Sequence, residues 1–298
     1  MAGLEGSGTR LKAQAVATLK SDHDLTLLLE AAGLARSTFY YQLGVMGRPD
    51  RQAQLKAEIT AVFTDSKARY GHRRVHITLR KRGWCVSRKT VWKLMRQLGL
   101  QCKTRSRKRF TSYRGEVGKI APNLLERDFI ATAPAEKWVT DVTEFRVGEE
   151  KLYLSPVMDL FDRSVLSYSI GRSPTVAFAV KPLKEALVKL SSGVGLVVHS
   201  DQGFHYQHQH WQNCLKHSGA TQSMSRKGNC LDNAVMENFF GHLKEEMFHH
   251  DHYQNIEELE AALHAYIQWY NNERISITLE GMSPIEYRSH ALTTKVSN

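Results

Sequence analysis

Three acidic residues stand out because their surroundings and spacing suit chemistry on a phosphodiester. Asp141 lies within the apolar segment 138–147, and Asp201 follows the short apolar segment 195–199. Glu237 stands beyond Asp201 with 35 residues between them, in a segment of helical character. Any one of the 30 acids in the chain is more often a surface charge, so the three are of interest only as a set.

A cluster of three carboxylates would repel an anionic phosphodiester unless cations neutralise it. At ~4 Å and an effective dielectric constant of ~20, each pair of like charges costs on the order of 4 kcal/mol. Carboxylate oxygens select Mg²⁺ or Mn²⁺, and two ions ~3.5–4 Å apart activate the attacking hydroxyl and stabilise the leaving oxygen of an in-line displacement. Asp141, Asp201 and Glu237 are therefore candidate ligands for a pair of divalent ions in the active complex.

The segments around these acids alternate between strand and helix patterns. Strands are predicted at 138–147, 151–159, 163–170, 195–199 and 221–224, and helices at 175–190, 211–217, 231–248 and 256–270. The hairpin-length gaps between the first three strands indicate an antiparallel meander. The order of elements is that of an α/β ribonuclease H-like (integrase) catalytic core.

This order predicts where each acid lies. Asp141 is expected in the middle of a strand, and Asp201 at the C-terminal end of a strand, where ligands of open α/β sheets gather. Glu237 is expected inside a helix, on the same face as Asn233 and Lys244, which stand four residues before it and seven after it.

The charge of the chain is unevenly distributed. Residues 66–119 hold 18 Lys and Arg and one acid, a net charge of +17, whereas the whole chain is +11 and the remainder is therefore −6. A basic block joined to a mildly acidic remainder indicates that one part follows DNA phosphates while another uses carboxylates.

Two all-α helix-turn-helix regions are predicted before the core. In the first, a helix over 24–32 ends at Gly33 and a second helix covers 35–43. In the second, helices are expected at 55–63, at 70–82 and, capped by Ser87, at 88–98. The domains are accordingly expected at 1–48 and 49–100 (helix-turn-helix regions), 101–135 (basic linker or arm), 136–290 (catalytic core with C-terminal helices) and 291–298 (tail).

Basic residues in and after the second region are the candidate DNA contacts. The last of its helices is predicted to expose four basic side chains. In the segment 101–113, basic and aromatic residues are interleaved without an apolar face that could pack in a core. The candidate residues for binding double-stranded DNA are Arg73, Arg74, Arg88, Lys89, Lys93, Arg96, Lys103, Arg105, Arg107, Lys108, Arg109, Lys227, Asn233 and Lys244.

Composition limits the other classes of function. There is no run of ~18 uncharged apolar residues, so no membrane span is expected. The four cysteines have no CxxC pairing and are expected to be free thiols of a reducing compartment. We expect a cytoplasmic, nucleoid-associated bacterial protein.

The motifs around these residues resemble those of the OrfB-type DDE transposases of the third insertion-sequence family, which have a retroviral-integrase-like core. The resemblance covers roughly residues 20–290, and the 35-residue gap is the family's own. The matching strings are Tyr70-Gly71-His72-Arg73-Arg74, Trp138-Val139-Thr140-Asp141-Val142-Thr143, His199-Ser200-Asp201-Gln202-Gly203, Ser225-Arg226-Lys227-Gly228-Asn229-Cys230, Asp232-Asn233-Ala234, Glu237-Asn238-Phe239-Phe240, Leu243-Lys244, and Tyr270-Asn271 with Arg274.

The resemblance implies roles and a reaction. Asp141, Asp201 and Glu237 would be the catalytic acids and Lys244 an accessory basic residue near DNA, while Ser276 departs from the His of many relatives. The enzyme would nick one 3′ end of an insertion sequence, attack the same strand near the other end, and integrate the resulting DNA circle into a target (copy-out, paste-in).

The resemblance also implies partners. The DNA would be the terminal inverted repeats of the element and the target, and joining two ends requires at least a dimer. An upstream-frame (OrfA-type) protein supplies a further helix-turn-helix and a coiled coil in this family. No heptad zipper is visible here, so the chain either works with such a protein or uses its own first 45 residues.

Other interpretations were weighed. The histidine groups 205–210 and 249–252 lack zinc-ligand spacing and are expected at the surface. Ser200 and Ser225 lack the context of a serine recombinase, and Tyr40 and Tyr41 are expected to pack a short helix and not to act as nucleophiles. A DNA-binding regulator with a decayed core, and a nuclease that uses only water, remain the rival functions.

Overall fold

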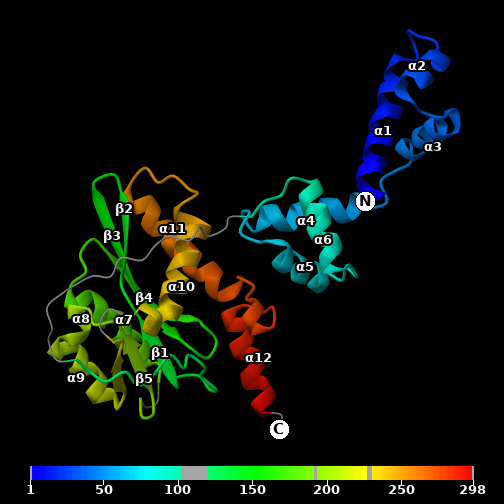
Figure 1. Cartoon of the computed structure of the whole chain (residues 1–298). Helices are drawn as coiled ribbons and strands as arrows, with labels where there is room; N and C mark the ends of the chain where they lie inside the picture. The colour runs from blue at the N-terminus through cyan, green and yellow to red at the C-terminus, as the bar shows by residue number, and fades with distance from the viewer. Residues whose placement is uncertain (1, 103–119, 191–192, 227–229, 297–298) are drawn as a thin grey trace. The chain divides into compact units, whose positions relative to one another are not determined.

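The computed structural model describes residues 2–102, 120–190, 193–226 and 230–296. These form two compact units, residues 1–61 and 62–298, with the catalytic-core segment in the second (Figure 1). The candidate residues of the segment 103–109 and Lys227 lie outside the described residues.

Three helices make up most of the first unit: α1 (Ala2–Leu19), α2 (Leu25–Ala32) and α3 (Arg36–Met46). Asp24 caps α2 by accepting hydrogen bonds from two backbone amides, and Gly33 ends it in the left-handed conformation at φ 59°. Phe39 is fully buried in the small core. The prediction that both tyrosines pack this helix was wrong for Tyr41, which is exposed, whereas Tyr40, although half exposed, contacts the Phe39 ring edge-on at 5.2 Å between centroids.

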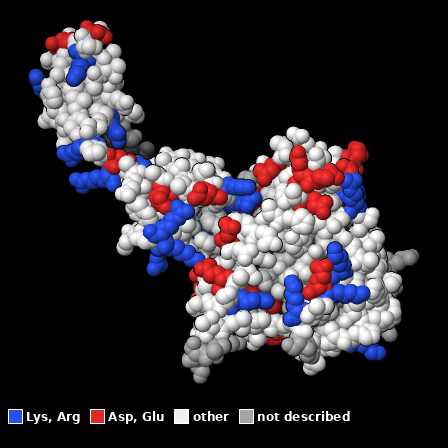
Figure 2. Space-filling view, turned by 180° about the vertical axis from the view of Figure 1, so that it is seen from behind, with Lys and Arg blue, Asp and Glu red and all other residues white. Residues whose placement is uncertain are grey.

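The predicted second helix-turn-helix region consists of α4 (Ala53–Asp65), α5 (His72–Lys81) and α6 (Arg88–Gln97). Ser87 caps α6 as expected, with its side chain accepting a hydrogen bond from the Thr90 amide. Val91, Leu94 and Met95 are buried, while the four basic residues predicted to face outward are all exposed. Figure 2 shows Lys and Arg side chains together with some acids on this helical region, and both signs of charge on the core as well.

The core is a six-stranded sheet that contains the expected antiparallel meander. The strands are β1 (Lys137–Thr140), β2 (Thr143–Val147), β3 (Glu150–Asp159), β4 (Val165–Gly171), β5 (Val197–Ser200) and β6 (Thr221–Met224). One edge of β3 pairs with β2 and then β1, and β4 pairs with its other edge, all antiparallel. β5 and β6 extend the sheet in parallel beyond β1.

The first predicted strand is broken where Asp141 stands. Residues 138–147 form two strands, β1 and β2, separated by Asp141 and Val142. Asp141 Oδ1 accepts a hydrogen bond from the Val142 amide at 2.7 Å, so that amide is not available to the sheet ladder. The expectation of a mid-strand position was therefore wrong: Asp141 follows the end of a strand.

Helices cover both faces of the sheet (Figure 1). On one side lie α7 (Val176–Val188), α8 (Phe204–Gln207) and α9 (Gln209–Ser218), and on the other α10 (Ala234–Leu243) and α11 (Ile256–Asn272). Adjacent strand residues point into different cores, Trp138 toward α7 and α9 and Val139 toward α10 and α11. Both faces of the sheet are therefore covered at β1.

The predicted helix 231–248 is three segments. A 3₁₀ turn (Cys230–Asn233) precedes α10, and a π-helical turn (Lys244–Phe248) follows it, closed by a hydrogen bond from the His249 amide to the Lys244 carbonyl. A short 3₁₀ turn (Ile277–Leu279) and α12 (Pro284–Val296) complete the chain. Among the described residues no helix is both long and apolar enough to cross a membrane, and Cys85, Cys102 and Cys214 are free.

Candidate active site

Asp141 and Asp201 follow two neighbouring parallel strands at the same end of the sheet. β1 and β5 pair with Val139 opposite His199, so each acid stands two residues beyond this pair. Neighbouring strands lie about 4.8 Å apart, and the two acids are therefore neighbours in space. The end of the strand pair, and not either sequence motif alone, brings them together.

The absence of a side chain at Gly203 leaves room for the Asp201 carboxylate in the turn after β5. Asp201 Oδ1 accepts a hydrogen bond from the Gly203 amide at 2.8 Å. A Cβ at position 203 would lie 2.9 Å from that oxygen, closer than side-chain carbons approach, so another residue would displace the carboxylate. This contact is the physical reason for an Asp-Gln-Gly sequence at this strand end.

The two carboxyl groups disfavour ionisation in their present surroundings. Burial, and then the charge of Asp201, hold the pKa of Asp141 well above its ordinary value of 3.8. Burial also raises the pKa of Asp201, against the opposing hydrogen bond from Gly203. Two acids that share a poorly solvated site repel each other in their charged forms.

Glu237 and Lys244 approach this site from the helical run that follows β6. Glu237 lies in the first turn of α10, and Lys244 begins the π-helical turn. The pKa of Asp141 is raised by the charge of Glu237 and lowered by the charge of Lys244. Both effects are smaller than those of burial and of Asp201. Lys244 Nζ lies 5.2 Å from the ring centroid of Phe145, a buried residue of β2. Asp141 is thus within electrostatic reach of the three other residues that were predicted to act with it.

The donor set suits a hard divalent cation, although the acids do not form a closed cage. Within the described part of the chain, no group of three His, Cys, Asp or Glu side chains is close enough to hold a metal ion. Asp141 and Asp201 nevertheless offer carboxylate oxygens that repel each other in the ionised form, and Glu237 lies within electrostatic reach. Such oxygens are the ligands that Mg²⁺ and Mn²⁺ select.

The prediction that the histidines lie at the surface was wrong for His205. His205 is buried, and its Nε2 lies 2.6 Å from the Pro174 carbonyl, so it is not a surface residue. This contact joins α8 to the segment before α7 and accounts for His205 without a metal.

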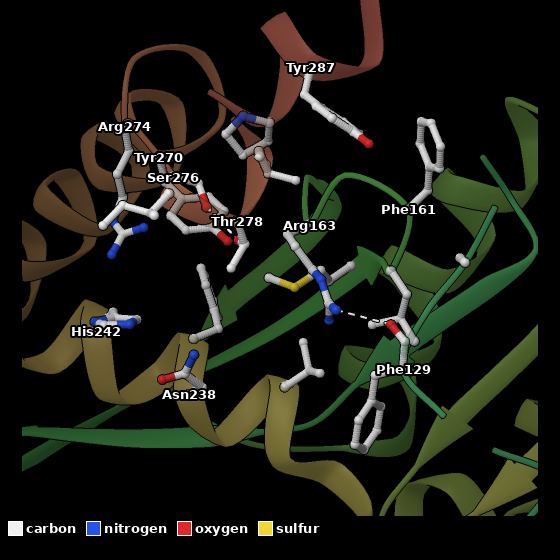
Figure 3. A pocket seen from close by; sticks show the side chains of 18 of the residues that line it. Phe129, Phe161, Arg163, Asn238, His242, Tyr270, Arg274, Ser276, Thr278 and Tyr287 are labelled. Atoms are coloured by element: carbon white, nitrogen blue, oxygen red, sulfur yellow. Dashed lines mark hydrogen bonds between the residues drawn. The ribbon is translucent and has the colours of Figure 1, made fainter. Parts of the chain in front are cut away.

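A cavity of about 550 Å³ lies on another side of α10 (Figure 3). Its lining includes Arg163, Asn238, His242, Tyr270 and Ser276, and none of the three candidate acids. Met158 in its wall pairs with Val139 of β1, and Leu160 lies just beyond the end of β3. Size alone does not make this cavity the site of the chemistry.

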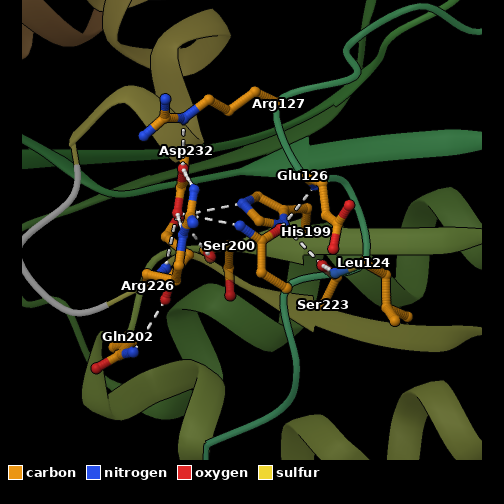
Figure 4. Close-up of polar contacts among 11 residues, drawn as sticks. Leu124, Glu126, Arg127, His199, Ser200, Gln202, Ser223, Arg226 and Asp232 are labelled. Atoms are coloured by element: carbon orange, nitrogen blue, oxygen red, sulfur yellow. Dashed lines mark hydrogen bonds and ion pairs between the residues drawn. The ribbon is translucent and has the colours of Figure 1, made fainter.

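A buried carboxylate that the sequence analysis did not single out fixes the start of α10 (Figure 4). Asp232 is fully buried and accepts hydrogen bonds from the Arg226 guanidinium at 2.9 and 3.0 Å, from Arg127 at 3.0 Å and from Asn123 at 3.0 Å. The Arg226 hydrogen bond is the main reason that the pKa of Asp232 lies far below its ordinary value. The contacts of Asp232 with Arg226, Arg127 and Asn123 fix the chain five residues before Glu237.

His199, close to the contacts of Asp232, has a structural role. Its buried ring lies between two serines of the neighbouring strand and turn, with Nδ1 2.8 Å from Ser223 Oγ and Nε2 3.1 Å from Ser225 Oγ. Burial lowers the pKa of His199 to about 4, so the ring is neutral at pH 7. The serine once considered for recombinase chemistry, Ser225, is therefore a buried partner of His199.

The exposed face of α6 fits the role predicted for it. Arg88, Lys89, Lys93 and Arg96 are exposed. Trp92, which the sequence analysis missed, is 43% exposed on the same helix and stacks under Arg96 at 5.1 Å. Its position between basic residues could have drawn attention to it, because exposed aromatic rings beside Arg and Lys suit base or sugar contact.

Two candidate DNA contacts have internal partners instead. Asn233 is 4% exposed and donates a hydrogen bond from Nδ2 to the Thr140 carbonyl, and it precedes α10 and does not share the helical face of Glu237. Arg74 binds the buried carboxylate of Glu246 at 3.2 Å, whereas its neighbour Arg73 is exposed. Arg74 and Asn233 are therefore withdrawn as DNA contacts, and Arg73 stays a candidate.

Comparisons with known proteins agree with this organisation. Integrase core domain models match residues 131–230 and 237–292, and an HTH-like domain model matches 49–109. The chain is 49% identical over 278 residues to InsK of insertion sequence element IS150 from Escherichia coli (strain K12), covering 93% of this chain and 98% of that protein.

It is also 37% identical to the transposase InsF of insertion sequence IS3A from the same strain, over 78% of this chain and 82% of that one. The chain belongs to the OrfB-type transposases of the third insertion-sequence family. Among solved structures, the HTLV-2 integrase catalytic core domain in complex with magnesium covers 53% of this transposase and 98% of that chain, at 18% identity and a TM-score of 0.38.

Membership of this family makes the protein a DDE-type transposase with a ribonuclease H-like integrase core and a helix-turn-helix-like region before it. The acids Asp141 and Asp201 lie within the first integrase core match, and Glu237 begins the second.

Proposed function

We propose that this transposase binds the ends of its insertion sequence and catalyses metal-dependent 3′-end cleavage and strand transfer. The observation that carries the proposal is the register of β1 and β5, which makes Asp141 and Asp201 neighbours at one strand end. Glu237 and Lys244 lie within electrostatic reach of the same point. Three carboxylates and one ammonium group suit an in-line exchange of phosphodiesters.

In this proposal Asp141, Asp201 and Glu237 hold two Mg²⁺ or Mn²⁺ ions. When bound, such ions lower the pKa of an attacking hydroxyl and neutralise charge on the leaving oxygen. The chain itself orients its carboxylates through the Val142 and Gly203 amides, and Lys244 provides positive charge beside them for the DNA phosphate.

The DNA partner is double-stranded: the terminal inverted repeats of the element and a target. The exposed residues of α6, together with Arg73 and the basic segment 103–109, would neutralise its phosphates. The transposase would act as at least a dimer, because two ends are joined, and either with an upstream-frame protein or through its own N-terminal helices. The copy-out, paste-in route with a circular intermediate, at the bacterial nucleoid in the cytoplasm, completes the proposal.

A strand-transfer assay with element-end DNA and Mg²⁺ tests the chemistry. We expect joined products from the wild type, and a loss of about a thousand-fold or more in Asp201→Asn, because metal binding and charge placement are lost together. Asp251→Asn, at an exposed acid, is the matched control and should keep wild-type activity. Activity that survives in Asp201→Asn would refute the site, and products formed only with water as nucleophile would favour a nuclease.

The salt dependence of DNA binding tests the role of the basic region. With ~6–8 phosphate contacts, the logarithm of the binding constant should fall with the logarithm of salt concentration at a slope of about −5 to −7. Lys93→Ala should reduce the magnitude of the slope by about one and leave the melting temperature unchanged. A slope near zero, or a large loss of stability in Lys93→Ala, would contradict this role.

A further inference from the structure

A second buried carboxylate lies two residues after Lys244 and plays no part in the chemistry proposed above. Glu246 is 4% exposed in the π-helical turn. Its oxygens accept hydrogen bonds from the Arg274 guanidinium at 2.7 and 2.8 Å, from Arg74 at 3.2 Å and from the Tyr266 hydroxyl at 2.8 Å. One carboxylate therefore holds two arginines from distant parts of the chain.

The same place joins the two segments by further hydrogen bonds. The Tyr70 hydroxyl donates to the Glu273 carbonyl at 3.1 Å and accepts from the Ile275 amide at 2.9 Å. Arg69 Nε donates to the Glu246 carbonyl at 3.0 Å, and its guanidinium lies 4.5 Å from the ring centroid of Trp269. The start of α5 is thus bound to the end of α11 and to the π-helical turn.

The residues that meet here include two sequence motifs with no role in the catalytic site. Tyr70 and Arg74 belong to the Tyr-Gly-His-Arg-Arg string before the core, and Arg274 belongs to the Tyr-Asn string near the C-terminus. We call the contact of Arg74, Glu246 and Arg274, with Tyr70 and Tyr266, the arginine joint.

Electrostatics favour one geometry of this joint. Although burial opposes its charge, the hydrogen bond and charge of Arg274 and then the charge of Arg74 hold the pKa of Glu246 at about 2. Burial, and then repulsion by Arg274, lower the pKa of Arg74, so its charge depends on Glu246. Buried charges tolerate little displacement, because separating them leaves a charge without a partner in a poorly solvated place.

Glu246 is connected directly to the catalytic helix. The π-helical turn begins at Lys244 and continues α10, which carries Glu237. A π turn inserts one extra residue into a helix and often marks a functional site. Here the turn allows Lys244 to lie over Phe145 while Glu246 points into the joint.

We propose that Glu246 is a positioning residue of the strand-transfer reaction: through Arg74 it fixes the helix-turn-helix-like segment against the turn that carries Lys244. Binding of element-end DNA by that segment then places the DNA relative to Glu237 and Lys244. The inference rests on the proposed function. It gives different roles to the adjacent residues Arg73 and Arg74, since Arg73 contacts DNA and Arg74 fixes the position of the helix-turn-helix-like segment.

The test compares Arg74→Gln with its matched control, Arg73→Gln, in the full-length protein. For Arg74→Gln we expect an unchanged dissociation constant for element-end DNA. The strand-transfer rate at saturating DNA should be roughly 10- to 100-fold lower, because the reacting groups would be misplaced. For Arg73→Gln we expect weaker binding, a salt slope reduced by about one, and an unchanged rate at saturation.

A conservative variant and a double mutant distinguish positioning from general damage. Arg74→Lys keeps a cation that can reach Glu246, and should restore the rate to within about threefold of wild type. Arg74→Gln combined with Glu246→Gln should be no slower than Glu246→Gln alone, because both act through one contact. Where Glu246→Gln does not fold, the Arg74 variants, which leave the contact of Arg274 intact, decide the question.

Two outcomes would overturn the inference: a wild-type rate in Arg74→Gln, or weaker DNA binding with an unchanged rate at saturation, as for Arg73→Gln. A wild-type protein that joins no strands under any metal condition would instead overturn the proposed function. These failures are distinguishable because the first two are measured in a preparation whose wild type is active.

Discussion

The helical run from Ala234 to Phe248 carries two acids, Glu237 near the catalytic site and Glu246 at the arginine joint, and the electrostatic environments of these two places are opposite. At the catalytic site, burial and the neighbouring Asp201 raise the pKa of Asp141. At the arginine joint, burial acts in the same direction on Glu246, but Arg274 and Arg74 outweigh it and the pKa is held at about 2. The difference comes from the neighbouring charges and not from the depth of burial.

The comparison shows which site is complete once the chain folds. The joint contains its own cations, so its carboxylate is ionised and its geometry is held by the protein alone. The acids of the catalytic site repel one another, and a divalent cation and a DNA phosphate would supply what the fold does not. Four measurements test this contrast.

The largest expected effect is on folding stability. Glu246→Gln removes the anion that two buried arginines share, and should lower the free energy of unfolding by about 3–5 kcal/mol. Asp141→Asn relieves repulsion and should leave metal-free stability unchanged or higher. Glu245→Gln is the control. The Glu245 carboxylate pairs with His250, which is more exposed than the arginines of the joint, so this substitution should cost at most about 1 kcal/mol. Denaturant titration measures all three, and equal losses would remove the contrast.

The second effect is on the pH dependence of stability. The pKa of Glu246 falls from 4.5 to about 2 on folding, so the stabilisation is complete above pH 4.5 and is lost as pH falls toward 2. Wild type should lose up to about 3 kcal/mol more than Glu246→Gln across this window. Parallel acid titrations of the two proteins would contradict a charged Glu246 in the fold.

The third effect is stabilisation by metal. At a Mg²⁺ concentration some tens of times its dissociation constant, wild type should gain roughly 2 kcal/mol at constant ionic strength. Asp201→Asn should gain little, whereas Arg74→Gln should gain as much as wild type, because the joint binds no metal. Thermal unfolding with and without Mg²⁺ checks this, and an equal gain in Asp201→Asn would place the metal elsewhere.

The smallest effect concerns one hydroxyl of the joint. Tyr70→Phe leaves the Ile275 amide without its acceptor and should cost about 1–2 kcal/mol. Tyr253→Phe removes one long hydrogen bond of 3.4 Å to the Met247 carbonyl and serves as the control, with a cost below about 1 kcal/mol. If the two variants lose the same stability, the Tyr70 hydroxyl does not tie the segments together.

Sequence reasoning found the elements that have strong local patterns. The meander, β5, β6 and most helices were predicted within a few residues, and Ser87 caps α6 as expected. It missed the break at Asp141, because an apolar strand with one acid looks continuous until a side chain is seen to accept the next amide. It also missed the π turn, because residues 231–248 have one uninterrupted helical pattern.

The site was predictable to a similar extent. The types and spacing of Asp141, Asp201 and Glu237 indicated a metal-dependent phosphodiester chemistry, and the resemblance supplied the family. The structural role of Glu246 was not predicted, because an acid in a charged segment looks like a surface residue. Asp232 was quoted only as part of a motif, since nothing local relates it to Arg127 and Asn123. Arg73 and Arg74 look alike in the sequence, yet one is exposed and the other is bound to Glu246.

The class of chemistry, the basic region and the order of elements could be predicted from residue types and local periodicity. Which charges have internal partners became known from the folded arrangement alone. Arg74 and Glu246 are 172 positions apart in the chain, and no local pattern relates them. Charges become either catalytic or structural according to what the fold places next to them, because burial makes each depend on its nearest neighbours.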